Sequence, residues 1–134
     1  MENRKILVVE DNVLNMKLMR GIFALGKYEI IEAMDAETGI RLARDEKPFL
    51  ILMDIQLPGM DGLEATRQLK ADSEMKGIPV VALTGFAMQG DQEKAIDAGC
   101  DGYLTKPVEV STVLETIKKF VGSENGNGSG QTNG

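Results

Sequence analysis

The feature that most constrains the fold of this chain is a series of five short apolar runs separated by longer segments with helical spacing. Each run has the length of a β-strand, and four have the composition of strands buried on both faces. The runs lie at residues 6–9, 28–31, 49–53, 79–83 and 102–104. Strands that alternate with helices form parallel sheets covered on both faces, because right-handed crossovers place helices on either side. The sequence therefore predicts a doubly wound α/β domain with five parallel strands.

The segments between these runs carry the apolar spacing of amphipathic helices. The first helix is predicted to begin after Asp11 or Asn12, either of which is a suitable N-cap, and to end at Gly26. Its apolar face is predicted at Leu14, Leu18, Ile22 and Leu25. Further helices are predicted at about residues 36–47, 61–72, 88–98 and 110–121. The helix at 88–98 has only a small apolar face, and a loosely anchored helix moves more easily.

Length and composition indicate one folded domain followed by a tail. A chain of 134 residues is long enough to bury a core without disulfides or metals. We assign the domain to residues 1–121 and the tail to residues 122–134, where ten of the 13 residues are Gly, Asn or Ser. A segment with so few apolar side chains is expected to be disordered. A native appendage and the start of a linker to an output domain fit this composition equally well.

Charge and residue usage exclude several classes of site. The net charge of −6 and the lack of histidine argue against a nucleic-acid-binding surface and against histidine-based catalysis or metal binding. Cys100 is the single cysteine, so no disulfide can form within the chain. No apolar run approaches the roughly 20 residues that span a bilayer, and residues 6–9 are too short for a signal-peptide core. We therefore expect a cytoplasmic protein that does not enter membranes.

Polar residues follow four of the five predicted strands. Glu10 and Asp11 follow the first strand, Asp54 the third, Thr84 the fourth and Lys106 the fifth. If the strand order is 2-1-3-4-5, these four strands lie side by side, and their carboxyl ends meet at one edge of the sheet. We therefore expect these side chains to converge in one acidic pocket.

Three carboxylates in one pocket call for a cation. Two unit charges 4 Å apart repel by about 4 kcal/mol at an effective dielectric constant of about 20. Oxygen ligands without His or Cys select Mg²⁺, Mn²⁺ or Ca²⁺, and Mg²⁺ suits a site with few carboxylates, several waters and a phosphoryl oxygen. Lys106 can pair with Asp54 at rest and with a phosphoryl oxygen afterwards, while Thr84 can donate to another oxygen. In this setting Asp54 can act as the nucleophile of phosphoryl transfer.

Four segments of the chain carry motifs that resemble the receiver domain family of response regulators. They are KILVVEDN at residues 5–12, LMDIQLPGMDG at 52–62, ALTG at 82–85 and GYLTKP at 102–107. The likeness covers about residues 4–121 and looks strongest to DivK-type single-domain regulators and to receivers attached to hybrid sensor kinases. It implies a CheY-like, flavodoxin-like fold with strand order 2-1-3-4-5. It also implies a role in two-component signalling, with self-catalysed phosphorylation and dephosphorylation, rather than enzymatic turnover.

The resemblance implies a role for the acidic residues of the pocket. Asp54 would accept a phosphoryl group from a phosphohistidine on a histidine kinase or a histidine phosphotransfer protein. Asp11, Asp54 and the main-chain carbonyl of Gln56 would bind Mg²⁺, or Mn²⁺ in its place, and Glu10 would assist through water. Many relatives carry two aspartates where this chain has Glu10 and Asp11. That variation occurs in the family and leaves direct coordination by Asp11 intact.

The resemblance also implies how the phosphoryl group is held and detected. Thr84 and Lys106 would contact it, and a cis peptide bond before Pro107 would aim Lys106 inward. Tyr103 matches an aromatic switch whose ring turns inward when the threonine moves. This movement would remodel the fourth helix, the fifth strand and the fifth helix, which together would form the surface for a downstream protein partner.

Other positions match those that set the lifetime and the source of the phosphoryl group. Gln56 and Phe86 would tune dephosphorylation by controlling nearby water, and a shielding Phe86 predicts a long-lived phosphoryl form. The surface that faces the phosphodonor is predicted on the first helix at Met16, Lys17, Met19 and Arg20. The sequence leaves open which proteins are the partners, and whether the domain stays a monomer or dimerises on phosphorylation.

Three rival functions fit these residues less well. A haloacid-dehalogenase-type phosphatase also uses a strand-end Asp and Mg²⁺, but it needs a second Asp two residues later, where this chain has Gln56. A flavodoxin-like flavin binder must cradle a phosphate in its first loop, and Glu10 and Asp11 would repel one. A degenerate receiver that only binds partners would usually lack the acceptor or the lysine, and both are present here.

Overall fold

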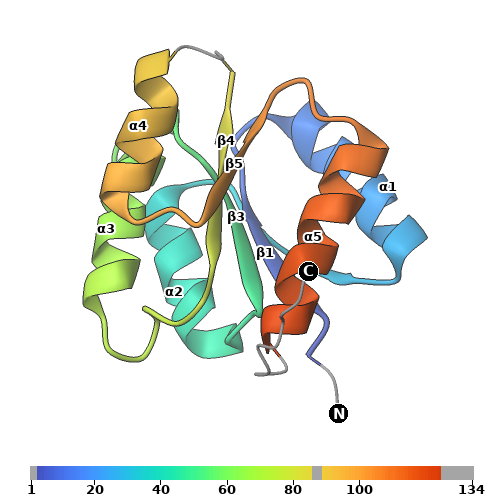
Figure 1. Ribbon diagram of the computed structural model, residues 1–134, viewed down its shortest axis with the longest axis horizontal. Helices are drawn as coiled ribbons and strands as arrows, with labels where there is room; N and C mark the ends of the chain where they lie inside the picture. Colours follow the sequence, from blue (N-terminus) through green and yellow to red (C-terminus); the bar gives the residue numbers. More distant parts are fainter. Residues whose placement is uncertain (1–2, 86–88, 125–134) are drawn as a thin grey trace.

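The computed structural model describes residues 3–85 and 89–124, which form a five-stranded parallel sheet between two layers of helices (Figure 1). The strand order is β2-β1-β3-β4-β5, and every pairing is parallel. The strands are β1 (Lys5–Val9), β2 (Glu29–Ala33), β3 (Leu50–Asp54), β4 (Val80–Thr84) and β5 (Gly102–Thr105). The predicted doubly wound α/β fold and its strand order are therefore confirmed.

Five helices of the described chain cover the sheet, with α1 and α5 on one face and α2, α3 and α4 on the other (Figure 1). They are α1 (Val13–Gly26), α2 (Ala36–Glu46), α3 (Gly62–Ala71), α4 (Gln89–Ala98) and α5 (Val110–Glu124). Helix α5 continues to Glu124, beyond Val121, where the predicted domain ends, and the rest of the predicted tail lies outside the described residues. Within the described ranges, no helix has both the length and the apolar character needed to cross a membrane.

The sheet separates two hydrophobic cores, and alternate residues of each central strand point into opposite ones. In β1, Ile6 and Val8 face the core beneath α1 and α5, whereas Leu7 and Val9 face the core beneath α2 and α3. Strands β3 and β4 are buried at every residue. Burial on both faces explains why the strands appear in the sequence as continuous apolar runs rather than as alternating patterns.

The prediction for the apolar face of α1 is wrong for three of its four residues. Leu14, Leu18 and Leu25 are exposed by 75%, 40% and 69%. The helix packs against the sheet through Met16, Met19, Ile22 and Phe23. Because this helix is apolar on two sides, helical spacing alone could not select the side that faces the core.

Side-chain caps set where the first three helices begin. Asn12 Oδ1 accepts a hydrogen bond from the main-chain amide of Asn15 at 2.9 Å. Asp35 and Asp61 accept equivalent bonds at the starts of α2 and α3, at 2.8 Å and 2.9 Å. Each cap satisfies an amide that the helix itself leaves unpaired. Of the two predicted N-caps of α1, Asn12 therefore takes this role, and Asp11 precedes it at the sheet edge.

Candidate functional site

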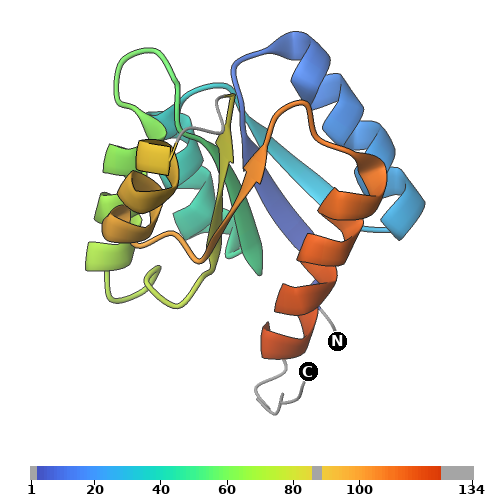
Figure 2. The same cartoon turned by 45° about the horizontal axis from the view of Figure 1, so that its top comes forward.

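The carboxyl ends of β1, β3, β4 and β5 meet at one edge of the sheet, which comes forward in Figure 2. Asp54 and Thr84 are the last residues of β3 and β4, and Lys106 follows β5 directly. Glu10 and Asp11 follow β1 in the same way. The fold therefore brings the five residues of the predicted pocket to a single edge.

Three carboxylates form a cluster at this edge. Glu10, Asp11 and Asp54 each offer one carboxylate oxygen, and these oxygens lie within 4.8 Å of one another. Glu10 and Asp54 are only 1% and 2% exposed, whereas Asp11 is exposed to solvent. The Lys106 ammonium nitrogen lies 2.7 Å from Asp54 Oδ2 and 2.9 Å from Glu10 Oε1. Three negative charges and one positive charge leave the ionised cluster with a net charge of −2.

The Asp54 carboxylate is held through both of its oxygens. The main-chain amide of Gln56 donates to Asp54 Oδ1 at 2.9 Å, and the Lys106 ammonium donates to Asp54 Oδ2 at 2.7 Å. Gly62 allows the first turn of α3 to pass close behind this residue, because a Cβ there would collide with the Asp54 carbonyl oxygen. Glu10 is held in turn by the main-chain amide of Asn12, which donates to Glu10 Oε2 at 3.0 Å. The two buried carboxylates are thus oriented by the protein alone.

Burial and charge shift two pKa values in the cluster. Burial raises the pKa of Glu10 above its usual value, and the charge of Asp54 adds to the rise, although Lys106 and the Asn12 amide oppose it. Burial alone would lower the pKa of Lys106, but its contacts with Asp54 and Glu10 outweigh that effect and raise it. Lys106 therefore stays an ammonium ion at neutral pH, and the surrounding negative charge favours a further cation.

The donor set of the cluster fits a hard divalent cation. All three ligand atoms are carboxylate oxygens, and the exposed side chain of Asp11 places one of them within reach of solvent. Oxygen ligands of this kind suit Mg²⁺ or Mn²⁺. The net charge of −2 that Lys106 leaves uncompensated matches the charge of one such ion.

The two predicted switch residues contact the first turn of α4. Thr84 is buried, and its hydroxyl donates to Asp91 Oδ2 at 3.4 Å, which is long for a hydrogen bond between oxygens. Tyr103 is 37% exposed, and its hydroxyl donates to Gln92 Oε1 at 3.0 Å. Asp91 and Gln92 were not among the residues predicted from the sequence. Topology could have indicated them, because the helix after the fourth strand must begin at the edge where Thr84 lies.

The remaining predicted residues are placed as follows. The peptide bond between Lys106 and Pro107 is cis. Gln56 is exposed, and its Oε1 lies 3.6 Å from the position that a Cβ would take at Gly85, so its side chain borders the loop after β4. Phe86 lies outside the described residues.

The surface predicted to face the phosphodonor on α1 is wrong in part. Met16 and Met19 are buried in the core beneath the helix. The Arg20 guanidinium forms two hydrogen bonds with the Glu32 carboxylate of β2, one of them at 2.8 Å. Lys17 is exposed. Methionine fills cores and adaptable surfaces equally well, so its presence on a helix does not show which side faces solvent.

Comparison with curated proteins agrees with this geometry. The family model of the response regulator receiver domain matches residues 6–118. The polar-differentiation response regulator DivK of Brucella anthropi is 47% identical over 119 residues, which cover 89% of this chain and 97% of that protein. DivK of Brucella ovis matches with the same identity and coverage.

Two solved structures extend the comparison to three dimensions. The receiver domain of a sensor histidine kinase from Pseudomonas aeruginosa PAO1, solved with a magnesium ion coordinated in its active site cleft, is 32% identical with a TM-score of 0.83. The match covers 90% of this chain and 98% of that chain. A chain from the co-crystal of the Saccharomyces cerevisiae histidine phosphotransfer protein Ypd1 and the receiver domain of Ssk1 is 28% identical with a TM-score of 0.85, over 92% of each chain. From its matched family model, its 47% identical relatives and its strand order, this chain belongs to the response regulator receiver domains of two-component signalling, and within them it is similar to DivK.

Proposed function

We propose that this domain accepts a phosphoryl group on Asp54 from a phosphohistidine donor, with Mg²⁺ in the acidic cluster, and then changes its affinity for a protein partner. The observation that carries the proposal is the setting of Asp54. It is a buried carboxylate at a strand end, fixed by Lys106 at 2.7 Å and lying in a cluster with two further carboxylates. A structural carboxylate has no need of two acidic neighbours, whereas a phosphoryl acceptor that uses a metal does.

The metal would be held by Asp11, Asp54 and the main-chain carbonyl of Gln56, with Glu10 acting through water. The close approach of the three carboxylate oxygens and their uncompensated charge support this assignment. The Pseudomonas aeruginosa receiver domain binds a magnesium ion in its active site cleft. When bound, Mg²⁺ supplies positive charge to the phosphoryl oxygens, and Mn²⁺ could supply the same charge.

The side chains of Asp54, Lys106 and Thr84 would carry out the phosphoryl transfer through their positions and charges. An Asp54 carboxylate oxygen attacks phosphorus, the new O–P bond forms as the N–P bond of the donor breaks, and the electron pair returns to the donor imidazole. Lys106 moves its hydrogen bond from Asp54 to a phosphoryl oxygen, and Thr84 donates to another. Both residues stand at the ends of neighbouring strands, so only short side-chain movements are needed.

The donor would dock on the exposed apolar side of α1 that borders the cluster. Val13 and Leu14 follow Asp11 by two and three residues and are exposed by 65% and 75%, and Leu18 lies one turn further along. Exposed leucines beside a reactive carboxylate are suited to an apolar helical partner. A partner of this class is known for another receiver domain, because the histidine phosphotransfer protein Ypd1 was co-crystallised with the receiver domain of Ssk1. The surface of α4, β5 and α5, which carries Tyr103, would bind the downstream partner.

Incubation with acetyl phosphate and Mg²⁺, followed by measurement of the intact mass, tests the proposal. We expect an increase of about 80 Da, the mass of one phosphoryl group. Asp54→Asn should abolish the increase. Asp61→Asn is the matched control, since this exposed carboxylate caps α3 and asparagine can cap as well. A wild-type mass that stays unchanged with acetyl phosphate, and also with a phosphorylated histidine phosphotransfer protein, would favour a receiver that only binds partners.

A further inference from the structure

Gly62, the first residue of α3, packs against the main chain of Asp54 with no room for a side chain. A Cβ at this position would lie 2.8 Å from Ile55 Cα and closer still to the Asp54 carbonyl oxygen. The φ angle of Gly62 is not positive, so glycine is needed here for space alone. A larger residue would therefore have to displace either α3 or the end of β3, which is hydrogen-bonded to a strand on each side.

The loop that joins Asp54 to Gly62 forms part of the proposed metal site. The main-chain amide of Gln56 donates to Asp54 Oδ1 at 2.9 Å, and the carbonyl of Gln56 is a proposed metal ligand. The loop closes where the Gly62 amide donates to the Ile55 carbonyl oxygen at 3.4 Å. A displacement at Gly62 is therefore passed to two of the three proposed ligands.

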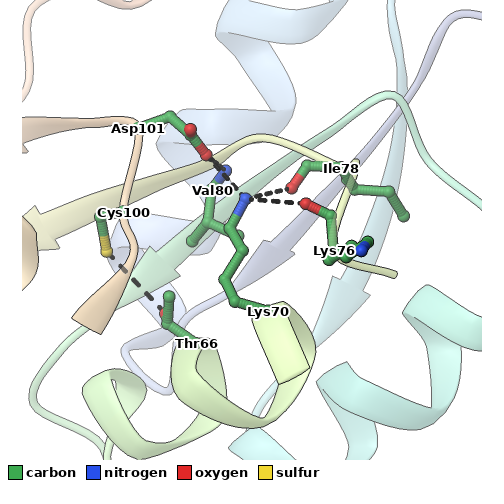
Figure 3. A network of polar contacts seen from close by, with 7 residues as sticks. All are labelled: Thr66, Lys70, Lys76, Ile78, Val80, Cys100 and Asp101. Carbon is green, nitrogen blue, oxygen red and sulfur yellow. Dashed lines mark hydrogen bonds and ion pairs between the residues drawn. The ribbon is translucent and has the colours of Figure 1, made fainter. Parts of the chain in front are cut away.

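The last turn of α3 is fixed by a network of polar contacts around Lys70 (Figure 3). The Lys70 ammonium donates to Asp101 Oδ2, just before β5, at 2.9 Å. It also donates to the carbonyl oxygens of Lys76 and Ile78, at 3.3 Å and 3.0 Å. Asp101 Oδ2 accepts a further bond from the main-chain amide of Val80 at 2.9 Å. These five residues, which we name the Lys70 network, tie α3 to the starts of β4 and β5.

Two further contacts hold α3 beside the connection between α4 and β5. The stem of Lys70 passes close to Gly99, where a Cβ would lie 2.9 Å from Lys70 Cγ. Thr66, which is buried in the middle of α3, donates to the Gly62 carbonyl oxygen at 2.8 Å and accepts from Cys100 Sγ at 3.9 Å (Figure 3). Helix α3 therefore cannot move away from β3 as a rigid body without breaking these contacts.

We propose that Gly62 is a positioning residue for the metal site and that the Lys70 network holds α3 against it. This inference rests on the proposed metal site. With α3 held at its far end, a side chain at position 62 pushes on the peptide between Asp54 and Ile55. The Asp54 carboxylate and the Gln56 carbonyl then no longer point at one metal ion. Groups that orient metal ligands typically change metal affinity by about 10- to 100-fold.

Calorimetric titration of the unphosphorylated domain with Mg²⁺ tests the role of Gly62 without a phosphodonor. Gly62→Ala should weaken Mg²⁺ binding about tenfold. Gly21→Ala is the matched control, because it adds the same methyl group to α1 where the new Cβ meets open space, and it should bind Mg²⁺ like the wild type. Hydrogen exchange in EDTA gives a readout without metal. The Gln56 amide should exchange faster in Gly62→Ala, because its bond to Asp54 is disturbed.

A second substitution separates positioning from a general loss of stability. Lys70→Met removes the ammonium but keeps a long apolar stem, so it frees the far end of α3 without touching the site. Alone, it should leave the Mg²⁺ affinity within about twofold of the wild type. Combined with Gly62→Ala, it should raise the Mg²⁺ affinity at least about threefold above that of Gly62→Ala, because α3 then yields in place of β3. The double variant should nevertheless be less stable than Gly62→Ala.

The possible outcomes test the two parts of the inference separately. Mg²⁺ binding by Gly62→Ala at the wild-type affinity would overturn the positioning role. A double variant that binds no better than Gly62→Ala would overturn the role of the Lys70 network. Circular dichroism checks that each variant is folded, and sucrose, which favours the folded state, is added for one that is not. A wild type that does not bind Mg²⁺ would contradict the proposed metal site itself.

Discussion

Lys106 shows at the scale of a single residue how a resting charge arrangement prepares a reaction. Its ammonium group lies within 2.9 Å of oxygens from two buried carboxylates, Asp54 and Glu10, and these contacts raise its pKa. Two such carboxylates without this cation would face both burial and mutual repulsion. Once Asp54 carries a phosphoryl group, the same ammonium can donate to one of the negatively charged phosphoryl oxygens. Stability and function therefore depend on the same atom.

Lys106→Met should lower the free energy of unfolding by about 2 kcal/mol in a buffer without divalent ions, because two buried carboxylates lose their shared partner. Urea denaturation measures this change. Adding MgCl₂ should recover part of the loss, since a bound cation replaces the missing charge. Lys118→Met, an exposed site on α5, is the control and should leave stability nearly unchanged. Equal stability of the two variants would show that Lys106 does not stabilise the cluster.

At the scale of elements, α1 and the strands differ in how much the sequence reveals. The strands could be predicted because burial on both faces produces continuous apolar runs, such as residues 49–53, in which every residue is buried. Helix α1 has apolar residues on two sides, and only packing against the sheet decides between them. The sequence therefore predicted the helix and its end at Gly26 but assigned Leu14 to the core and Met19 to the surface.

Two side-chain truncations on α1 test which side of the helix faces the core. Met19→Ala should lower the free energy of unfolding by about 3 kcal/mol, because Met19 is buried and its removal leaves a cavity. Leu14→Ala should change it by less than about 0.5 kcal/mol, because Leu14 is 75% exposed. The same Leu14 variant should slow phosphorylation by a phosphohistidine protein but not by acetyl phosphate. A large stability loss in Leu14→Ala would mean that this side of the helix is packed.

At the scale of the whole molecule, the site exists because four strand ends share one edge of the sheet. That edge could be predicted from the strand order, and with it the meeting of Glu10, Asp11, Asp54 and Lys106. Thr84 ends β4 at the same edge. The contacts of α4 could not, because they depend on how the helix is turned when it packs. The outward position of the Tyr103 hydroxyl, bound to Gln92, is a packing result of the same kind.

Chemical mapping of the phosphorylated residue tests most directly whether Asp54 is the phosphoryl acceptor. The domain is incubated with acetyl phosphate and Mg²⁺, reduced with borohydride to convert an aspartyl phosphate to homoserine, digested, and analysed by mass spectrometry. We expect homoserine at position 54 alone, and none when EDTA removes the divalent ions. Modification at Asp11 in its place, or an Asp54 that stays intact with both acetyl phosphate and a phosphohistidine donor, would contradict the assignment.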